Sequence, residues 1–301
     1  SAIHLNIQGD FTANSASVIR LHSRQYGDLV IPLTQLSVRP ADFGTSVSLV
    51  RGVAAAFQDL GLNIGGFDAV IRSDIPIGAG LSSSAAFSVL IARVLNELYN
   101  NGEIPEIVLA RTAQAAENNH FGKPCGLMDQ MACSWGGVVG IDFAVPEAPA
   151  VTPLKLDPAA HGFALCIIDS GAGHEDLTDE YAAVPEEMRS VAAVFGKEVL
   201  REVREVDYYA RLSELRSLCS DRAVLRGMHF YKDDRAAQEE ARALSAGNFP
   251  AFLSLVNASG LSSSLLLQNI WSPKDPEYQP VSLALALARD LLDGAGAVRV
   301  H

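Results

Sequence analysis

A glycine- and serine-rich loop between a strand pattern and a helix pattern constrains the fold of this chain more than any other feature. Residues 67–72 (FDAVIR) alternate apolar with polar side chains, which predicts a strand. Residues 76–85 read PIGAGLSSSA, and from there to Tyr99 small and apolar residues recur at helical spacing without a breaker. The pattern predicts a strand, a tight loop and a helix that begins at Ser83 or Ser84.

The loop has the composition of an anion-binding turn. Gly78 and Gly80 permit positive φ and let a ligand approach the backbone closely. Ser82, Ser83 and Ser84 add hydroxyls at a helix start, where unpaired N–H groups and the helix dipole favour a negative charge. We interpret the loop as a phosphate-binding turn. Taken alone, these residues leave a serine-capped helix after a glycine turn as the alternative.

Other glycine motifs with known chemistry do not match this loop. No Lys follows the glycines, so the loop is not a P-loop. Position 83 is Ser where a dinucleotide-binding fingerprint requires Gly, and the Gly-x-Ser-x-Gly elbow of the α/β-hydrolases is absent. These exclusions leave a phosphate loop of another class.

Two acidic residues follow at positions that are unusual for structural acids. Glu117 is predicted near the end of a helix that starts at Pro105, where the helix dipole opposes a carboxylate. Asp129 follows a glycine-containing turn and is flanked by Leu127 and Met128. An acid in apolar company is either a cap or a functional group. For each residue taken singly, a solvated glutamate and a helix-capping aspartate remain open.

Together these motifs resemble those of the GHMP kinases, which include galactokinase, homoserine kinase, mevalonate kinase and phosphomevalonate kinase. Residues 76–85 resemble the second motif of that family, and the run of three serines is its galactokinase-like form. Residues 116–118 (AEN) and 125–130 (CGLMDQ) are similar to galactokinases specifically, and residues 177–185 (LTDEYAAVP) resemble a bacterial branch. The resemblance extends over essentially the whole chain.

The resemblance implies a role for each matching residue. Ser84 and Glu117 would ligate Mg²⁺, and Asp129 would act as catalytic base beside the anomeric hydroxyl of a sugar. Gly126 and Tyr181, together with Asp129, would line the sugar. The implied nucleotide-binding residues are Pro76, Gly78, Ala79, Gly80, Leu81, Ser82, Ser83 and Ser84. These residue types suit the chemistry, because Mg²⁺ prefers oxygen ligands and phosphoryl transfer depends on positioning and charge neutralisation.

Two motifs of the galactokinase pattern have no match here. The N-terminal segment Gly-Arg-x-Glu followed by His-Thr-Asp is missing, and residues 1–5 (SAIHL) resemble the strand that normally follows it. Residues 296–301 (GAVRVH) resemble the approach to the third, glycine-rich motif. We expect that both ends were trimmed or are absent, and that a polypeptide of this length alone has weak or no kinase activity.

The resemblance implies an α+β, two-domain GHMP kinase fold, with an N-terminal part like domain 2 of ribosomal protein S5 and a helix-rich α+β C-terminal part. We place the junction near residues 145–149 (VPEAP), which gives an ATP-binding domain at 1–150 and a C-terminal domain at 151–301. The residue patterns predict strands at 18–22, 29–33, 67–72, within 136–143 and at 163–168, helices at 47–60, 84–99 and 105–118, and a mostly helical region at 185–292.

Composition limits the partners of the chain. Its net charge is −12 and no cluster of Lys or Arg occurs, which argues against nucleic acid and anionic membranes. No uninterrupted apolar run reaches about 18 residues and the N-terminus lacks a signal-peptide pattern, so we predict a soluble, cytoplasmic protein. The four cysteines lack zinc-site spacing and are predicted to be reduced thiols.

The leading functional hypothesis is an ATP-dependent sugar 1-kinase that acts on galactose or a close relative, with ATP and Mg²⁺. A galactokinase-like protein that senses sugar and ATP is the second hypothesis, against which the intact serine run at 82–84 argues. Another GHMP kinase, with an amino-acid or isoprenoid substrate, is the third, and residues 126–130 (GLMDQ) weigh against it.

Overall fold

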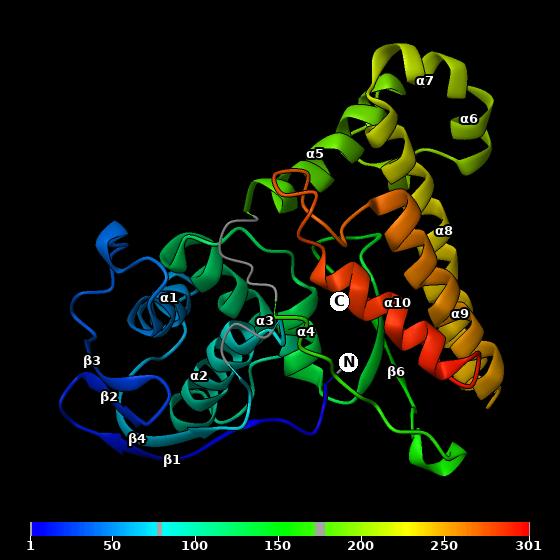
Figure 1. Ribbon diagram of the computed structural model, residues 1–301. Coiled ribbons are helices and arrows are strands. Elements are labelled where there is room, and N and C mark those ends of the chain that lie inside the picture. Colours follow the sequence, from blue (N-terminus) through cyan, green and yellow to red (C-terminus); the bar gives the residue numbers. More distant parts are fainter. Residues whose placement is uncertain (1, 77–79, 172–177, 301) are drawn as a thin grey trace. The chain divides into compact units, whose positions relative to one another are not determined.

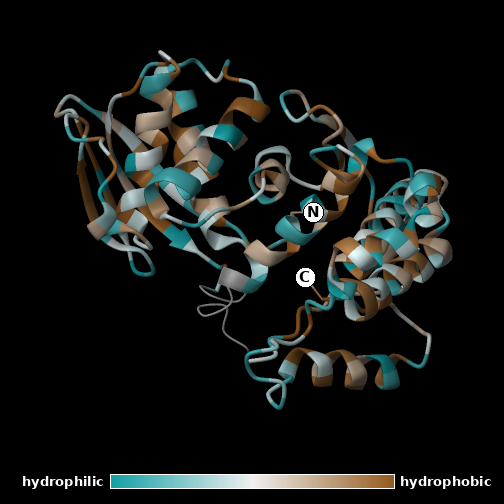
Figure 2. Ribbon diagram, turned by 90° about the horizontal axis from the view of Figure 1, so that it is seen from above, coloured by the Kyte–Doolittle hydropathy of each residue, from teal (hydrophilic) through white to brown (hydrophobic). Residues whose placement is uncertain are grey.

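The computed structural model describes residues 2–76, 80–171 and 178–300 (Figure 1). The chain divides into two compact units, residues 1–139 and 140–301. Strands and helices occur in both, which confirms the expected α+β class. Figure 2 shows apolar and polar residues interleaved along the helices, as in helices that bury one face and expose the other.

The first unit is built on a four-stranded sheet with the strand order β1-β4-β2-β3. Strand β4 pairs antiparallel with β1 and parallel with β2, and β2 pairs antiparallel with β3. The strands are β1 (Ile7–Asn14), β2 (Val18–Ser23), β3 (Gly27–Pro32) and β4 (Gly66–Ser73). Three of them were predicted. The sequence reading missed β1, because its run IQGDFTAN is mostly polar and exposed.

One face of this sheet is buried under helices. Alternate residues of the strands, such as Ile19, Ile31 and Ile71, are buried, whereas Val30 and Val70, which precede two of them, are exposed. The buried side chains join those of α1 and α2 in one apolar core. The helices of this unit are α1 (Ser46–Asp59), α2 (Ser83–Tyr99), α3 (Glu106–Ala115), a π-helix, η2 (Ala116–Phe121), and α4 (Met128–Trp135), with a 3-10 turn, η1 (Pro40–Asp42).

Gly52 lets helix α1 pack tightly against the π-helix η2. A Cβ added at Gly52 would lie 2.8 Å from both Cα and Cβ of Ala116 and 2.9 Å from Cβ of His120. Contacts this short cannot form without displacing the backbone of η2. The absence of a side chain at position 52 therefore fixes where η2 lies.

We expect Gly52→Ala to lower the free energy of unfolding by about 1–3 kcal/mol, because overpacking a dense interior forces its neighbours apart. Chemical denaturation monitored by circular dichroism measures this change. Gly126→Ala is the matched control, because nothing lies within 4 Å of a Cβ added at Gly126. Equal stability of the two variants would contradict the tight packing at Gly52.

The second unit is mostly helical, as predicted for residues 185–292. It begins within β5 (Val138–Asp142), which pairs with β6 (Ala150–Leu154) in a two-stranded sheet. Its α-helices are α5 (Thr178–Val194), α6 (Glu205–Ala210), α7 (Leu212–Leu218), α8 (Asp221–Ser245), α9 (Phe249–Ser262) and α10 (Pro280–Leu292). Three short helical turns complete the unit: η3 (Ala159–His161), η4 (Leu200–Glu202) and the π-helix η5 (Ser263–Leu267). A core around Tyr208 and Leu215 joins α5 to α8.

Two strand predictions are wrong. Residues 163–168 were expected to form a strand, but they form no regular structure, and Leu165, Ile167 and Ile168 are exposed. An apolar run becomes a strand only where a neighbouring strand pairs with its backbone, and none does among the described residues. Residues 2–5 are not a strand either, since β1 begins at Ile7.

One helical stretch, Phe249–Leu267, is long and apolar enough at 19 residues to cross a membrane by length and composition alone. It is not an uninterrupted apolar run, because it contains Asn257 and several serines. Core helices of soluble proteins share these properties, and 28% of the most apolar window is buried in the structure.

Candidate active site at the start of helix α2

The predicted loop leads into α2 as expected, and its last residues lie at the helix start. Gly80 has φ of 70° and Ser82 has φ of 52°, so both adopt the left-handed conformation. Ser82 occupies the N-cap position of α2, with Ser83 and Ser84 as the first helical residues. Pro76 lies exposed after β4, and Leu81 is half-buried. Residues 77–79, which include the predicted Gly78 and Ala79, lie outside the described residues.

The hydroxyl of Ser82 binds Asp129 and does not cap its own helix. Ser82 Oγ donates to Oδ2 of Asp129 at 2.7 Å, and its side chain makes no capping bond. The serine-cap alternative is therefore wrong for Ser82. The backbone N–H groups of the first turn of α2 consequently lack a side-chain cap from this residue and suit an anion.

Asp129 lies in the first turn of α4 and is half-buried. The N-cap of this helix is Leu127, so the capping alternative for Asp129 is wrong. Its carboxylate reaches instead across to Ser82, 47 residues earlier in the sequence. A carboxylate held by a hydroxyl next to a helix N-terminus can accept a proton from a substrate hydroxyl.

Glu117 is buried in the π-helix η2 and binds Ser84. Only 2% of the residue is exposed, so the solvated alternative for Glu117 is wrong. Ser84 Oγ donates to Oε2 of Glu117 at 2.9 Å. A π-helical turn at the end of α3 is a feature that often marks functional sites. The two residues predicted as metal ligands are therefore neighbours in the structure.

Burial raises the pKa of Glu117, and the hydrogen bonds from Gln130 and Ser84 oppose that shift. The nearby Asp129 raises the pKa further, since two like charges disfavour each other. A cation bound between these groups would offset both effects. The site therefore holds two carboxyl groups beside the N-terminus of α2, and Lys123 offsets their charge in part.

Gln130 belongs to the motif at residues 125–130 and contacts Glu117, a role that the sequence alone does not indicate. It is 1% exposed, and its Nε2 donates to Oε1 of Glu117 at 2.7 Å. The two oxygens of Glu117 thus each accept one hydrogen bond, from Ser84 and from Gln130. Gln130 follows Asp129 in α4. The first turn of this helix therefore carries the carboxylate of Asp129 and binds the carboxylate of Glu117. Its position next to Asp129 was the one sequence signal that could have identified it.

The loop between η2 and α4 is held by side-chain amides. Asn118 Oδ1 accepts from the backbone N–H of Cys125 at 2.7 Å, and Gln114 Nε2 donates to the carbonyl of Cys125 at 3.1 Å. Gly126, a predicted sugar-lining residue, follows directly and is exposed. Burial raises the pKa of the Cys125 thiol to about 11, so this thiol is protonated at neutral pH and is no nucleophile.

Tyr181 lies in the other unit. It belongs to the first turns of α5, and 59% of the residue is exposed. The described first unit thus brings together Ser82, Ser84, Glu117 and Asp129, and the role of Tyr181 in sugar binding stays a prediction.

The donor set fits a magnesium ion that is bound partly by substrate. Ser84 and Glu117 offer a hydroxyl and a carboxylate, and Mg²⁺ is commonly held by one or two carboxylates together with phosphates and water. Within the described ranges there is no group of three or more His, Cys, Asp or Glu residues that could hold a metal alone. Any ion at Glu117 would need further oxygens from a ligand such as a nucleotide.

Comparison with known families places this site in context. Residues 48–137 match the model of the GHMP kinases N-terminal domain, a range that contains most of α1, all of α2 to α4, and Ser82, Ser84, Glu117 and Asp129. The chain is 30% identical over 234 residues to a galactokinase from Streptomyces coelicolor, covering 77% of this chain and 59% of that protein. It is 32% identical over 203 residues to a galactokinase from Actinobacillus pleuropneumoniae, covering 65% of this chain and 50% of that protein.

A solved structure shows the same fold. The Lactococcus lactis galactokinase complexed with galactose matches 91% of this chain and 70% of its own, with a TM-score of 0.73 and 22% sequence identity. The expected GHMP kinase fold is therefore confirmed. Residues 48–137 are similar to the N-terminal domain of the GHMP kinases. The chain is similar in sequence to galactokinases, and it spans less than two thirds of the length of the curated relatives named above.

Proposed function

We propose that this chain is an ATP-dependent sugar kinase, or the larger part of one, that phosphorylates the anomeric hydroxyl of galactose or a close relative. The observation that carries the proposal is the double pairing at the start of α2. Ser82 binds Asp129 and Ser84 binds Glu117, so the proposed proton acceptor and the proposed metal ligand both lie beside one helix N-terminus. Phosphoryl transfer requires a phosphate site, a cation and an oriented hydroxyl, and these residues supply places for all three.

In the proposed reaction the N-terminus of α2 binds the phosphates of ATP through its unpaired N–H groups. The hydrogen bond from Ser82 keeps Oδ2 of Asp129 in place, and the carboxylate orients the sugar hydroxyl and accepts its proton. The sugar oxygen forms the new bond to the γ-phosphorus as the bond to the β-phosphate oxygen breaks and ADP leaves. Ser84 and Glu117 would hold Mg²⁺, which neutralises charge on the phosphates when bound.

The proposal is tested by a panel of free sugars with ATP and Mg²⁺, reading ADP formation. We expect ADP to form with galactose or a close relative and not without sugar. ADP formation that depends instead on mevalonate, phosphomevalonate or homoserine would assign the chain to another GHMP kinase activity. Binding of sugar and ATP with no ADP from a polypeptide extended at both ends would favour a sensing protein.

We expect Gln130→Leu to weaken Mg²⁺ binding about 10–100-fold, because a group that orients a metal ligand contributes roughly this much. The change leaves Oε1 of Glu117 without its donor while keeping a side chain of similar size. Mn²⁺ binding followed by electron paramagnetic resonance, in the presence of a non-hydrolysable ATP analogue, measures the affinity. The matched control is Gln8→Leu at an exposed position of β1. Unchanged Mn²⁺ affinity in a folded Gln130→Leu variant would contradict the role of Gln130.

A further inference from the structure

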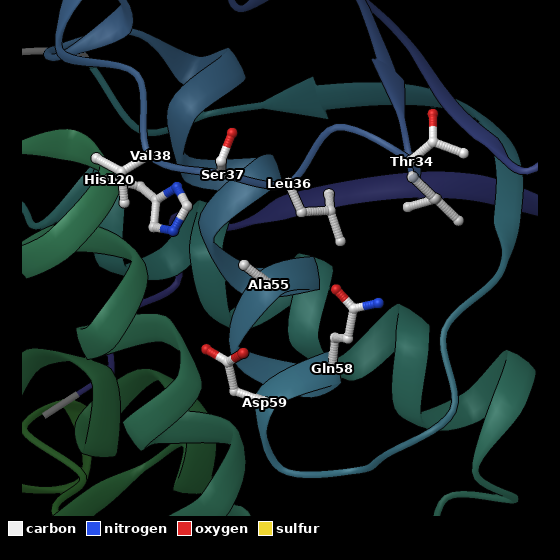
Figure 3. Close-up of a pocket in the computed structure, with 9 residues that line it drawn as sticks. Thr34, Leu36, Ser37, Val38, Ala55, Gln58, Asp59 and His120 are labelled. Carbon is white, nitrogen blue, oxygen red and sulfur yellow. The ribbon is translucent and has the colours of Figure 1, made fainter.

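The first unit contains a hollow that is separate from the residues at the start of α2. Its volume is about 390 Å³, within the range of sites for small molecules, and Figure 3 shows the residues around it. The segment after β3 forms one wall, the last turns of α1 form another, and His120 of η2 completes it. The lining residues are Leu33, Thr34, Leu36, Ser37, Val38, Ala55, Gln58, Asp59 and His120. Ser82, Ser84, Glu117 and Asp129 are not among them.

Four polar side chains of the lining are available to a ligand. Thr34 and Ser37 offer hydroxyls, Gln58 offers an amide and Asp59 offers a carboxylate. None of these four side chains forms a hydrogen bond or ion pair within the described parts of the chain, and all four residues are exposed. They can therefore bind a ligand without first breaking a contact within the protein, which lowers the cost of binding.

His120 adds a fifth polar group, and its state is neutral. It is 7% exposed, and its Nδ1 is buried with no hydrogen-bond partner among the residues that the structure describes. Burial lowers the pKa of His120, the nearby Arg51 lowers it further, and Asp59 opposes the shift in part. A neutral imidazole has one nitrogen that accepts a hydrogen bond. Figure 3 shows its ring at the same side of the hollow as Val38.

The charge of the lining decides which ligands fit. Asp59 carries the one formal charge, since no Lys or Arg belongs to the lining and His120 is neutral. Nucleotides and sugar phosphates would place their negative charge near this carboxylate without a compensating cation. The remaining polar groups are neutral donors and acceptors, and Leu36 and Ala55 provide apolar surface between them.

We propose that this hollow binds a neutral polyhydroxylated molecule, a monosaccharide or a cyclic polyol, at a site distinct from the start of α2. Hydroxyl groups of the ligand donate to Asp59 and accept from or donate to Gln58, Thr34 and Ser37. The apolar C–H face of the ring packs on Leu36 and Ala55. This site is separate from the proposed kinase reaction, because none of its lining residues belongs to the group at the start of α2.

Nuclear magnetic resonance of the methyl-labelled protein tests the proposal, because the signals that shift show where the ligand binds. The protein is titrated with galactose, with glucose and with myo-inositol, each without nucleotide. We expect saturable shifts of the methyl signals of Leu33, Leu36, Val38 and Ala55 with at least one of these probes. The methyl of Ala85 reports separately on the start of α2. Shifts confined to Ala85, or no saturable shift at the four lining residues, would overturn the second site.

Two variants and one alternative ligand test whether the lining residues bind the polyol. Asp59→Ala, at an exposed position, is expected to weaken binding at least tenfold, and Ala55→Phe is expected to fill the hollow and abolish it. Gln35→Ala is the control, because Gln35 lies in the same segment but does not line the hollow. Equal binding by Asp59→Ala and Gln35→Ala would overturn the proposal. Saturation of the four methyl signals by ethanolamine but by none of the three polyols would also overturn it, in favour of a cation site.

Discussion

Replacing Asp129 with asparagine is expected to lower the turnover of sugar phosphorylation by about 10²–10⁴-fold, the range typical of losing a general base. Asparagine has nearly the same shape and can still accept the hydrogen bond from Ser82, which is 2.7 Å long in the wild-type chain. It cannot accept the proton of the sugar hydroxyl. Steady-state kinetics with ATP, Mg²⁺ and galactose measure the loss, and calorimetry is expected to show sugar and ATP affinities close to wild type.

The matched control for this change is Asp10→Asn, which removes a carboxylate from an exposed position of β1. This variant is expected to turn over at the wild-type rate. Near-wild-type turnover by Asp129→Asn would exclude Asp129 as the base. A large loss of sugar or ATP affinity in that variant would assign it to binding instead.

The second large effect is expected from Glu117→Gln, which should remove the response of the protein to Mg²⁺. A ligand that binds the folded state at 100 times its dissociation constant stabilises it by about 2.7 kcal/mol. With an ATP analogue present, we expect Mg²⁺ at such a concentration to stabilise the wild-type protein by about this amount and the variant hardly at all. The amide has nearly the same shape, and its one oxygen can still accept a hydrogen bond from Ser84 or Gln130, but it lacks the charge that holds the ion. Thermal unfolding monitored by fluorescence measures the difference.

In the metal-free protein, the same variant should become relatively more stable as the pH rises. Burial raises the pKa of Glu117 above its ordinary value of 4.5, so the folded protein holds a proton that the unfolded chain has already released. Stability contributed by the protonated carboxyl is complete below the ordinary pKa and is lost as the pH rises through the folded pKa. The Glu117→Gln variant has no such loss, so its stability relative to wild type increases over that window and is constant above it.

Glu103→Gln at an exposed position of the same unit is the control for both measurements, and neither effect is expected there. A Glu117→Gln variant that Mg²⁺ stabilises as strongly as wild type would show that Glu117 does not bind the ion. A stability difference that shrinks as the pH rises would contradict the effect of burial on its pKa.

The parts of the fold that could be predicted from sequence are those whose signals are local. The alternation along β2 and β4 and the helical spacing after Ser83 reflect which side chains face the core, and both are visible within a few residues. The strand prediction at residues 163–168 is wrong because strand formation there does not depend on local residues alone. Their apolar character predicts burial, but strand formation depends on a distant partner that a local pattern does not contain.

In the candidate site, too, local motifs could be predicted from the sequence, whereas contacts between distant residues could not. The loop at residues 76–85 could be read as an anion site from its glycines and serines, and the resemblance to galactokinases selected Glu117 and Asp129. The pairing of Ser82 with Asp129 spans 47 residues, and that of Ser84 with Glu117 spans 33, so no local pattern encodes either contact. Gln130 was missed for the same reason, because its contact with Glu117 exists only after α4 packs next to η2.

The most direct test of the proposed reaction is to identify its product by ³¹P and ¹H nuclear magnetic resonance. The reaction contains galactose, ATP and Mg²⁺, with this chain and, in parallel, a polypeptide extended at both ends. The account predicts that the active protein forms one sugar phosphate, with phosphorus bound to the oxygen at C1, in an amount equal to the ADP released. Phosphate at any other hydroxyl, or ADP accompanied by inorganic phosphate without a sugar phosphate, would contradict it.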